Sequence, residues 1–284
     1  MTRLSAAVQT IREVSRLTTL ALWRGLVGFV SSDDLTYAAS ISYYSLLSLF
    51  PLLMLALVLL GRVTSDASDR NVVLAFVLQY FPAQFEFITA QLDAFRANSI
   101  SLSVAGTIGL LWGALGFFGA ISTAVNHAWG VEQTRNFLTH KLFSFGMLLV
   151  AGALLLAALL LVSAGGVVGA GWFGQVIERF PSLLLLRSLA MRNATTLLFI
   201  LVVGLIYYFV PNAKVRFRDV WIGAFLTGLL WKAALMAFSL YMRDMTVFMR
   251  INGSIAAVVV FLVWVYTQAV ILLYGVEFTA AYAR

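Results

Sequence analysis

The segment Asp33–Gly61, "DDLTYAASISYYSLLSLFPLLMLALVLLG", decides the fold. Two carboxylates open it, and it then runs from Ala38 to Leu60 without a charged residue. As a helix this uncharged run would be about 35 Å long, enough to cross about 30 Å of hydrocarbon. The segment therefore predicts a membrane-spanning helix, but a plain anchor would need neither its hydroxyl groups nor its proline.

The composition of the whole chain also indicates a protein that is embedded in lipid. Of its 284 residues, 62% are hydrophobic and only 11% are charged, whereas soluble domains carry about 25% charged residues. The absence of cysteine excludes disulfides and cysteine-ligated metals, and two histidines are too few for a histidine-rich site. We expect no metal, no cofactor and no nucleic acid, and we assign the net charge of +7 to loops near anionic lipid.

Hydropathy predicts an all-α, polytopic membrane protein with one membrane domain, residues 1–284. Residues 1–32 alternate arginine with apolar residues and predict an interfacial amphipathic helix. Residues 38–282 form the predicted transmembrane bundle. Between its first two spans, the uncharged stretch Asn71–Phe85 is too short to cross, so Asn71–Asn98 predicts a helical hairpin, either interfacial or re-entrant. The six predicted spans are Ala38–Leu60, Ser103–Trp129, Leu142–Gly165, Ala194–Val210, Val220–Tyr241 and Ser254–Val276.

The placement of lysine and arginine predicts the orientation. With the N-terminus inside, the basic N-terminal segment and the short cluster "KVRFRD", Lys214–Asp219, fall on the cytoplasmic side. We therefore expect both termini to be cytoplasmic.

The first span carries a polar face. Ser42, Ser45 and Ser48 recur every three residues, and Pro51 cannot donate its backbone hydrogen bond and should kink the helix. A carbonyl freed by the proline needs a partner from protein or trapped water. The serines, with Tyr43 and Tyr44, are therefore either a packing seam or the wall of a wet path.

Glycines mark the second span for close packing. Gly109, Gly113 and Gly116 lie on one stripe and include a GxxxG pattern, which favours close approach of another helix. The partner helix could belong to the same chain or to a second protomer.

Four further polar residues are candidates for a substrate path. Lys232 stands in the middle of the fifth span, where a charge is costly and usually faces a bundle interior, a carboxylate or water. Glu277 lies at the inner end of the last span, where its position favours the membrane interface; the alternative is a buried carboxylate that pairs with Lys232. Asn126 either pins a helix end or joins the path, and Arg135 either marks the boundary or holds a lipid phosphate.

Several blocks in register resemble the YihY/BrkB family of bacterial inner-membrane proteins. They are "AASISYYSLLSLFPLLMLALVLLG", "WGALGFFGAISTAVNHAWGVEQTRNFL", "YYFVPNAKVRFRDVWIGAFLTGLLWK" and "GSIAAVVVFLVWVYTQAVILLYGVEF". The resemblance implies six transmembrane helices in the cytoplasmic membrane, and it carries old ribonuclease (ribonuclease BN) and virulence labels together with a suggested transport role. "INGS" departs from the family pattern, which often has an aromatic before Gly-Ser. No catalytic residue carries over.

These features favour a transporter or flippase-like protein for an amphipathic, anionic solute or lipid. Lys232 would neutralise the substrate, and Tyr43, Tyr44 and Ser45 would line its path. Two alternatives stay open: a non-catalytic scaffold for envelope assembly, in which the chain forms a homo-oligomer or binds a partner, and a membrane hydrolase or ribonuclease. The enzyme would need acidic residues to converge on a metal, so we expect no enzyme activity and membrane lipids as the main partners.

Overall fold

A computed structural model describes residues 2–63, 104–131, 138–139, 141–147, 149–150, 196–244 and 246–283. Within them the chain forms helices and short connections and no strand, which confirms the all-α prediction for this part of the chain. The predicted hairpin Asn71–Asn98, most of the third predicted span and Arg135 lie outside the described residues.

The described helices follow five of the predicted spans and the N-terminal helix. Their bounds are Thr2–Ser31 for α1, Asp34–Val63 for α2, Val104–Ala128 for α5, Phe217–Asp244 for α9 and Thr246–Ala283 for α10, with a shorter apolar helix at Thr196–Phe209. Two stretches, Phe217–Met242 and Val258–Ala283, are long and apolar enough to cross a membrane within the described residues. The count of six spans stays a prediction.

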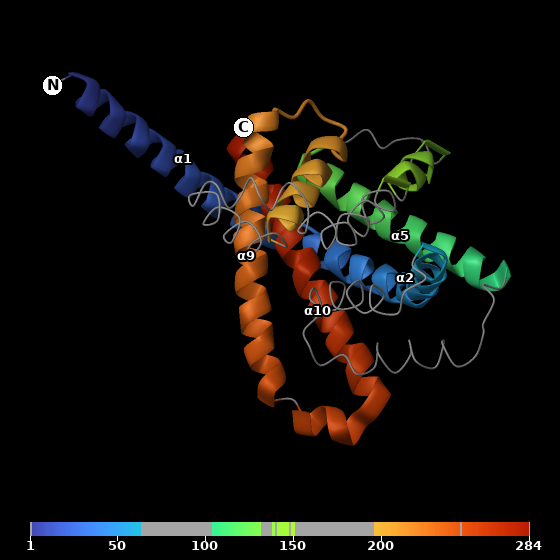
Figure 1. The fold of residues 1–284 in the computed structure, drawn as a ribbon. Helices are drawn as coiled ribbons and strands as arrows, with labels where there is room; N and C mark the ends of the chain where they lie inside the picture. The colour runs from blue at the N-terminus through green and yellow to red at the C-terminus, as the bar shows by residue number, and fades with distance from the viewer. Residues whose placement is uncertain are drawn as a thin grey trace, which may run out of the picture.

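Helix α10 begins earlier than the sequence indicated. The prediction placed the start of the last span at Ser254, but the helix is continuous from Thr246. Figure 1 shows its first turns lying across one end of the bundle before the helix turns along α9.

Helix α5 ends in a glycine-based cap. Gly130 adopts a positive φ of 65°, its amide donates to the His127 carbonyl at 2.8 Å, and the Val131 amide donates to the Asn126 carbonyl at 3.0 Å. This is the double hydrogen bond of a Schellman motif, which requires a left-handed residue just after the helix. The cap fixes the last turn of α5, from which Asn126 and His127 project.

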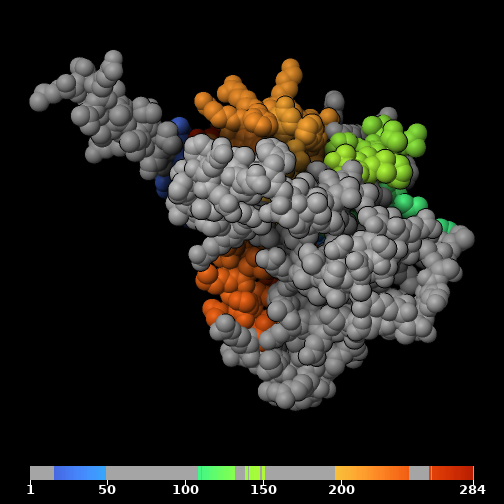
Figure 2. Space-filling view, in the orientation of Figure 1, coloured from blue at the N-terminus to red at the C-terminus, as the bar shows by residue number. Residues whose placement is uncertain are grey.

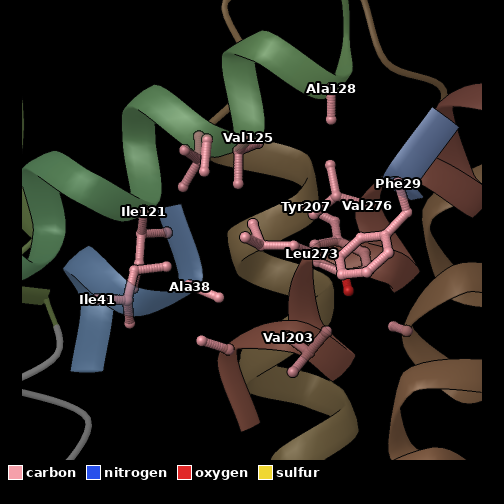
Figure 3. Close-up of a cluster of buried hydrophobic side chains, with 14 of the residues drawn as sticks. Phe29, Ala38, Ile41, Ile121, Val125, Ala128, Val203, Tyr207, Leu273 and Val276 are labelled. Atoms are coloured by element: carbon pink, nitrogen blue, oxygen red, sulfur yellow. The ribbon is translucent and has the colours of Figure 1, made fainter. Parts of the chain in front are cut away.

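The core gathers at one end of the bundle. Figure 3 shows side chains from the last turns of α1 and α5, the first turns of α2 and the end of α10 meeting around Tyr207 and Leu273, which are 1% and 0% exposed. Every one of these helices has a chain connection or a terminus at this end. The core therefore lies at the end of the bundle that holds the C-terminus and the connection 210–216, the side predicted to be cytoplasmic.

Helices α9 and α10 pack antiparallel through small residues. A Cβ added at Gly223 would collide with the Thr279 side chain, and one added at Gly275 would collide with Thr227. Each threonine instead donates to the carbonyl four residues earlier in its own helix, at 2.9 Å for Thr227 and 2.6 Å for Thr279. The reciprocal pairing fixes the register of the two helices and lets their backbones approach closely.

The inner half of α1 packs along α10. A Cβ at Gly25 would come within 2.9 Å of the Phe278 backbone, and the Tyr274 hydroxyl donates to the Leu22 carbonyl at 3.3 Å. The opposite side of α1 exposes apolar side chains, including Trp23 at 65% and Val30 at 69%. Figure 1 shows the first half of α1 projecting beyond the other helices, as a helix lying along a membrane surface would.

Candidate functional site

The carboxyl groups of Asp34 and Glu277 lie close to each other near the junction of α1 and α2. Asp34, in the first turn of α2, is 0% exposed, and its Oδ2 accepts a hydrogen bond of 2.7 Å from the Ser32 hydroxyl. Its Oδ1 is buried and receives no hydrogen bond from the described residues. The carboxyl of Glu277, on α10, lies within hydrogen-bonding reach of Asp34.

Four structural elements enclose this carboxyl pair. Gly28 of α1 lies directly on Glu277, because a Cβ built there would be 2.7 Å from its Oε2. From α5, His127 is close enough to act electrostatically on Asp34, and its ring packs against Tyr37 with centroids 5.6 Å apart. The pair therefore lies where α1, α2, α5 and α10 come together.

The electrostatics of Asp34 are set by competing effects. Burial raises the pKa of the Asp34 carboxyl above its ordinary value of 3.8, and Asp33 acts in the same direction. The Ser32 hydroxyl, His127 and the Glu277 carboxyl lower the pKa, but burial outweighs them. Asp34 precedes the predicted first span, so this holds at the end of the bundle and not at membrane depth.

Sequence reasoning anticipated only part of this site. It included Glu277 among the path residues and offered it as a partner for Lys232, whereas the structure brings it to Asp34. The burial of Asp34 was missed. The available signal was the pair of carboxylates in "SSDD" directly before a long apolar run, because adjacent residues at the start of a helix point to different sides. No group of three or more metal-ligating His, Cys, Asp or Glu side chains occurs in the part of the chain that the structure describes.

Asn126 pins the end of α5 to the connection before α9. Its Oδ1 accepts a hydrogen bond of 2.7 Å from the Asn212 amide, and its Nδ2 donates to the Ser122 carbonyl at 2.7 Å. Of the two alternatives that the sequence left open for Asn126, this geometry corresponds to the one in which the side chain pins the end of a helix. It couples two segments 86 residues apart in the chain.

The polar face of the first span turns largely toward α5. Ser42 and Ser48 donate to carbonyls of their own helix at 2.7 and 3.1 Å, and the Tyr44 ring fills the space that a Cβ at Gly116 would need. Ser45 is half-buried, and Tyr43, 57% exposed, packs edge-on against Tyr44. These contacts favour the packing seam. Helix α2 continues through Pro51, whose side chain lies outside those described, so the kink stays a prediction.

The three glycines of the stripe on α5 differ in whether another helix packs closely against them. Gly113 lies against the backbone of Ser48, with a built Cβ 3.0 Å from the Ser48 nitrogen, and Gly116 lies against Tyr44. At Gly109 no atom of the described residues comes within 4 Å of a built Cβ. The close partner of α5 is thus α2 of the same chain at two of the three predicted positions.

Lys232 lies on an exposed face of α9 and not in the bundle interior. Its neighbours one and two turns away, Phe225, Leu229 and Met236, are 57%, 50% and 65% exposed. Figure 2 shows a stretch of α9, in orange, at the surface of the face drawn there. Lys232 therefore interrupts an outward-facing apolar stripe.

Gln268 of α10 lies at the same depth, and sequence reasoning overlooked it. The pairs Gly223–Thr279 and Thr227–Gly275, continued by the Phe238–Trp264 ring contact at 4.6 Å, bring residue 232 level with residue 270. Gln268 is two residues away, or about 3 Å along the axis. Both ends of its buried amide lack a hydrogen-bond partner among the described residues, which is unusual for a buried polar group.

Comparisons with known proteins relate the chain to membrane proteins. The sequence pattern of the Virulence factor BrkB family matches residues 27–284. A UPF0761 membrane protein from Alkalilimnicola ehrlichii is 30% identical over 251 residues, 87% of this chain but only 54% of its own length. Another from Aeromonas salmonicida is 28% identical over 87% of this chain and 84% of its own length.

A relative from Bacillus subtilis, YfkH, carries a ribonuclease-like name and is 29% identical over 86% of this chain and 88% of its own length. The chain spans about half the length of the first of these relatives. No solved structure matches the chain. The match over residues 27–284, together with the apolar helices, shows that the chain belongs to the Virulence factor BrkB family of membrane proteins.

Proposed function

We propose that the protein moves an amphipathic, anionic solute or lipid across the bacterial inner membrane, with both termini in the cytoplasm. The observation that carries this proposal is the place of Lys232. It stands fifteen residues after Phe217 and ten before Met242 in a span of 26 residues, about 22 Å and 15 Å from the two ends. At that depth a cation is costly and typically serves a substrate pathway or a charged partner.

The surroundings of Lys232 favour an amphipathic substrate. The exposed apolar side chains beside it, Leu229 and Met236, offer contact for acyl chains, while the ammonium attracts a phosphate or carboxylate. The amide of Gln268, at the same depth, is buried and lacks a hydrogen-bond partner among the described residues, so it marks a second polar position in mid-span.

The test uses proteoliposomes that contain a head-group-labelled phosphatidylglycerol, with a membrane-impermeant quencher added outside. We expect the parent protein and Lys232→Arg to expose inner-leaflet lipid to the quencher, and Lys232→Met to reduce the rate at least tenfold. Lys214→Met is the matched control, because Lys214 is exposed in the connection before α9 and not within the span. Correctly folded Lys232→Met that moves lipid at the parent rate would remove the mechanism.

The scaffold alternative uses the same exposed stripe as a protein contact. It predicts that Lys232→Met changes oligomeric state in mild detergent while the parent moves no lipid. A membrane hydrolase stays open as the second alternative, because two of the acidic residues that it would need to converge on a metal, Asp34 and Glu277, do lie together. Lys232 and the apolar side chains beside it support transport best.

A further inference from the structure

We propose that the start of α9 binds the head groups of anionic phospholipids through Arg216 and Arg218, which flank the exposed ring of Phe217. The partner is the head-group layer of the leaflet beside the connection 210–216, on the side predicted to be cytoplasmic. The inference does not depend on the transport proposal, which rests on Lys232.

The first argument is the position of these three residues at the edge of an apolar span. Phe217 is the first residue of the 26-residue stretch Phe217–Met242, which is long and apolar enough to cross a membrane. The end of such a stretch lies where hydrocarbon meets the head groups, and aromatic and basic side chains are enriched there. Side chains of this part of the chain, in light orange, project at the top of Figure 2, and Arg216, Phe217 and Arg218 are all exposed.

The second argument is the positive charge of this surface. Neither guanidinium group has an ion pair or a hydrogen bond with the residues that the structure describes. Asp219 is the only carboxylate between Val210 and Val220, and it is buried, so it does not neutralise the surface. Arginine matches the geometry of phosphate oxygens and binds them with charge-assisted hydrogen bonds. The surface is therefore complementary to lipids whose head groups carry a net negative charge.

The third argument is the aromatic platform between the two cations. The Phe217 ring packs edge-on against Tyr208 and against Trp221, with the ring centroids 5.6 Å apart in both pairs. These contacts fix the ring, although 59% of the side chain stays exposed. An apolar ring held at the boundary of the hydrocarbon can enter the top of the acyl chains while the neighbouring arginines reach the phosphates above it.

The packing of the neighbouring helices holds this surface in one shape. A Cβ built at Gly228 of α9 would collide with Ile200 of the helix Thr196–Phe209, so the two helices that carry the aromatic rings pack closely. The connection between them is fixed as well, because the Asn212 amide donates to Asn126 Oδ1 at 2.7 Å. The surface is therefore organised before a lipid binds, which lowers the entropic cost of binding.

A lipid leaflet fits this surface better than a nucleic acid does. Residues two positions apart at the start of a helix do not face each other, so Arg216 and Arg218 reach separate phosphates on either side of the ring. A leaflet offers phosphates on all sides at one depth, with an apolar layer beneath them for Phe217. A nucleic acid would stack its bases on exposed aromatic rings, but Phe217 begins the apolar span and lies at the hydrocarbon boundary.

The test measures which lipids gather beside this surface in the full-length protein. The chain has no cysteine, so Ala213→Cys, at an exposed position of the connection, takes a single bimane label. The labelled protein is placed in phosphatidylcholine nanodiscs with a small fraction of either phosphatidylglycerol or phosphatidylcholine that carries a nitroxide quencher on its acyl chain. We expect the labelled phosphatidylglycerol to quench the bimane at least twofold more strongly than the labelled phosphatidylcholine.

The difference between the two lipids should vanish in Arg216→Gln/Arg218→Gln and persist in Arg216→Lys/Arg218→Lys, which keeps the charge. The matched control is Arg16→Gln/Arg24→Gln, which removes two exposed arginines from α1 and should leave the difference in place. Equal quenching by both lipids in the parent would overturn the proposal, as would an unchanged difference in Arg216→Gln/Arg218→Gln or an equal loss in the α1 control. Binding of fluorescent oligouridylate that is lost only in Arg216→Gln/Arg218→Gln would overturn it in favour of a nucleic-acid surface.

Discussion

The glycine stripe of α5 allows the same substitution to be made at a packed and at an open position of one helix. At Gly113 a new Cβ would lie 3.0 Å from the Ser48 nitrogen, 3.1 Å from its Cα and 3.2 Å from the Leu47 carbonyl carbon. Favourable carbon contacts need about 3.5–4.0 Å. The obstacle is the backbone of α2, so the two helices would have to separate. At Gly109, by contrast, nothing in the part of the chain that the structure describes lies within 4 Å of a new Cβ.

Comparing Gly113→Ala with Gly109→Ala isolates the free-energy cost of packing an added Cβ against α2. Both substitutions place alanine in a helix interior and gain the same propensity, about 1 kcal/mol. Gly109→Ala should therefore leave the free energy of unfolding unchanged or raise it by about 1 kcal/mol. Gly113→Ala adds overpacking against Ser48, which typically costs about 1–3 kcal/mol. We expect Gly113→Ala to be less stable than Gly109→Ala by about that amount.

The assay is reversible unfolding in mixed micelles with rising mole fraction of sodium dodecyl sulfate, followed by tryptophan fluorescence at two protein concentrations. Equal stability of the two variants would refute the α2–α5 contact. A loss of stability in Gly109→Ala that grows as the protein is diluted would mean that Gly109 faces a second protomer, which is the homo-oligomer left open by the sequence.

Three further predictions concern the end of the bundle where the core gathers. The Tyr207 hydroxyl donates to the Leu272 carbonyl at 2.6 Å and contacts the Thr227 hydroxyl at 2.9 Å, so Tyr207→Phe should lower the free energy of unfolding by about 1 kcal/mol. Tyr208→Phe, at a partly exposed neighbour, should lower it by under about 0.5 kcal/mol, and equal losses in the same unfolding assay would contradict the contact. Burial raises the pKa of Asp34 in the folded protein, so the stability that its protonated carboxyl contributes is complete below the unfolded pKa of about 3.9 and is lost as pH rises through the folded pKa. The melting temperature of the parent should therefore fall over that pH window, whereas that of Asp34→Asn should not. Melting temperatures of the two proteins that change in parallel with pH would contradict this prediction. Asn126→Ala should speed hydrogen exchange at the Asn212 amide by tenfold or more, since that amide loses its 2.7 Å acceptor, and unchanged exchange would show that the pin is unimportant.

The course of the helices could be predicted because lipid imposes a simple rule on sequence. Each apolar run had to become a helix, since hydrocarbon leaves backbone groups no other partner, and α2, α5 and α9 follow their predicted ranges within a few residues. The start of α10 could not be predicted in the same way. Asn252 and Gly253 favour a turn locally, but the helix continues through them.

The candidate site was harder because it depends on contacts between distant segments. The sequence of one span shows that the charge of Lys232 costs free energy at membrane depth, but it cannot tell which side of α9 faces the bundle. In the structure the Lys232 side chain faces outward. Likewise, Glu277 and Asp34 are 243 positions apart, and only the packing of α1 and α2 on α10 brings them together. Gly113 and Gly116 were easier, because a glycine in an apolar helix has few purposes other than close approach.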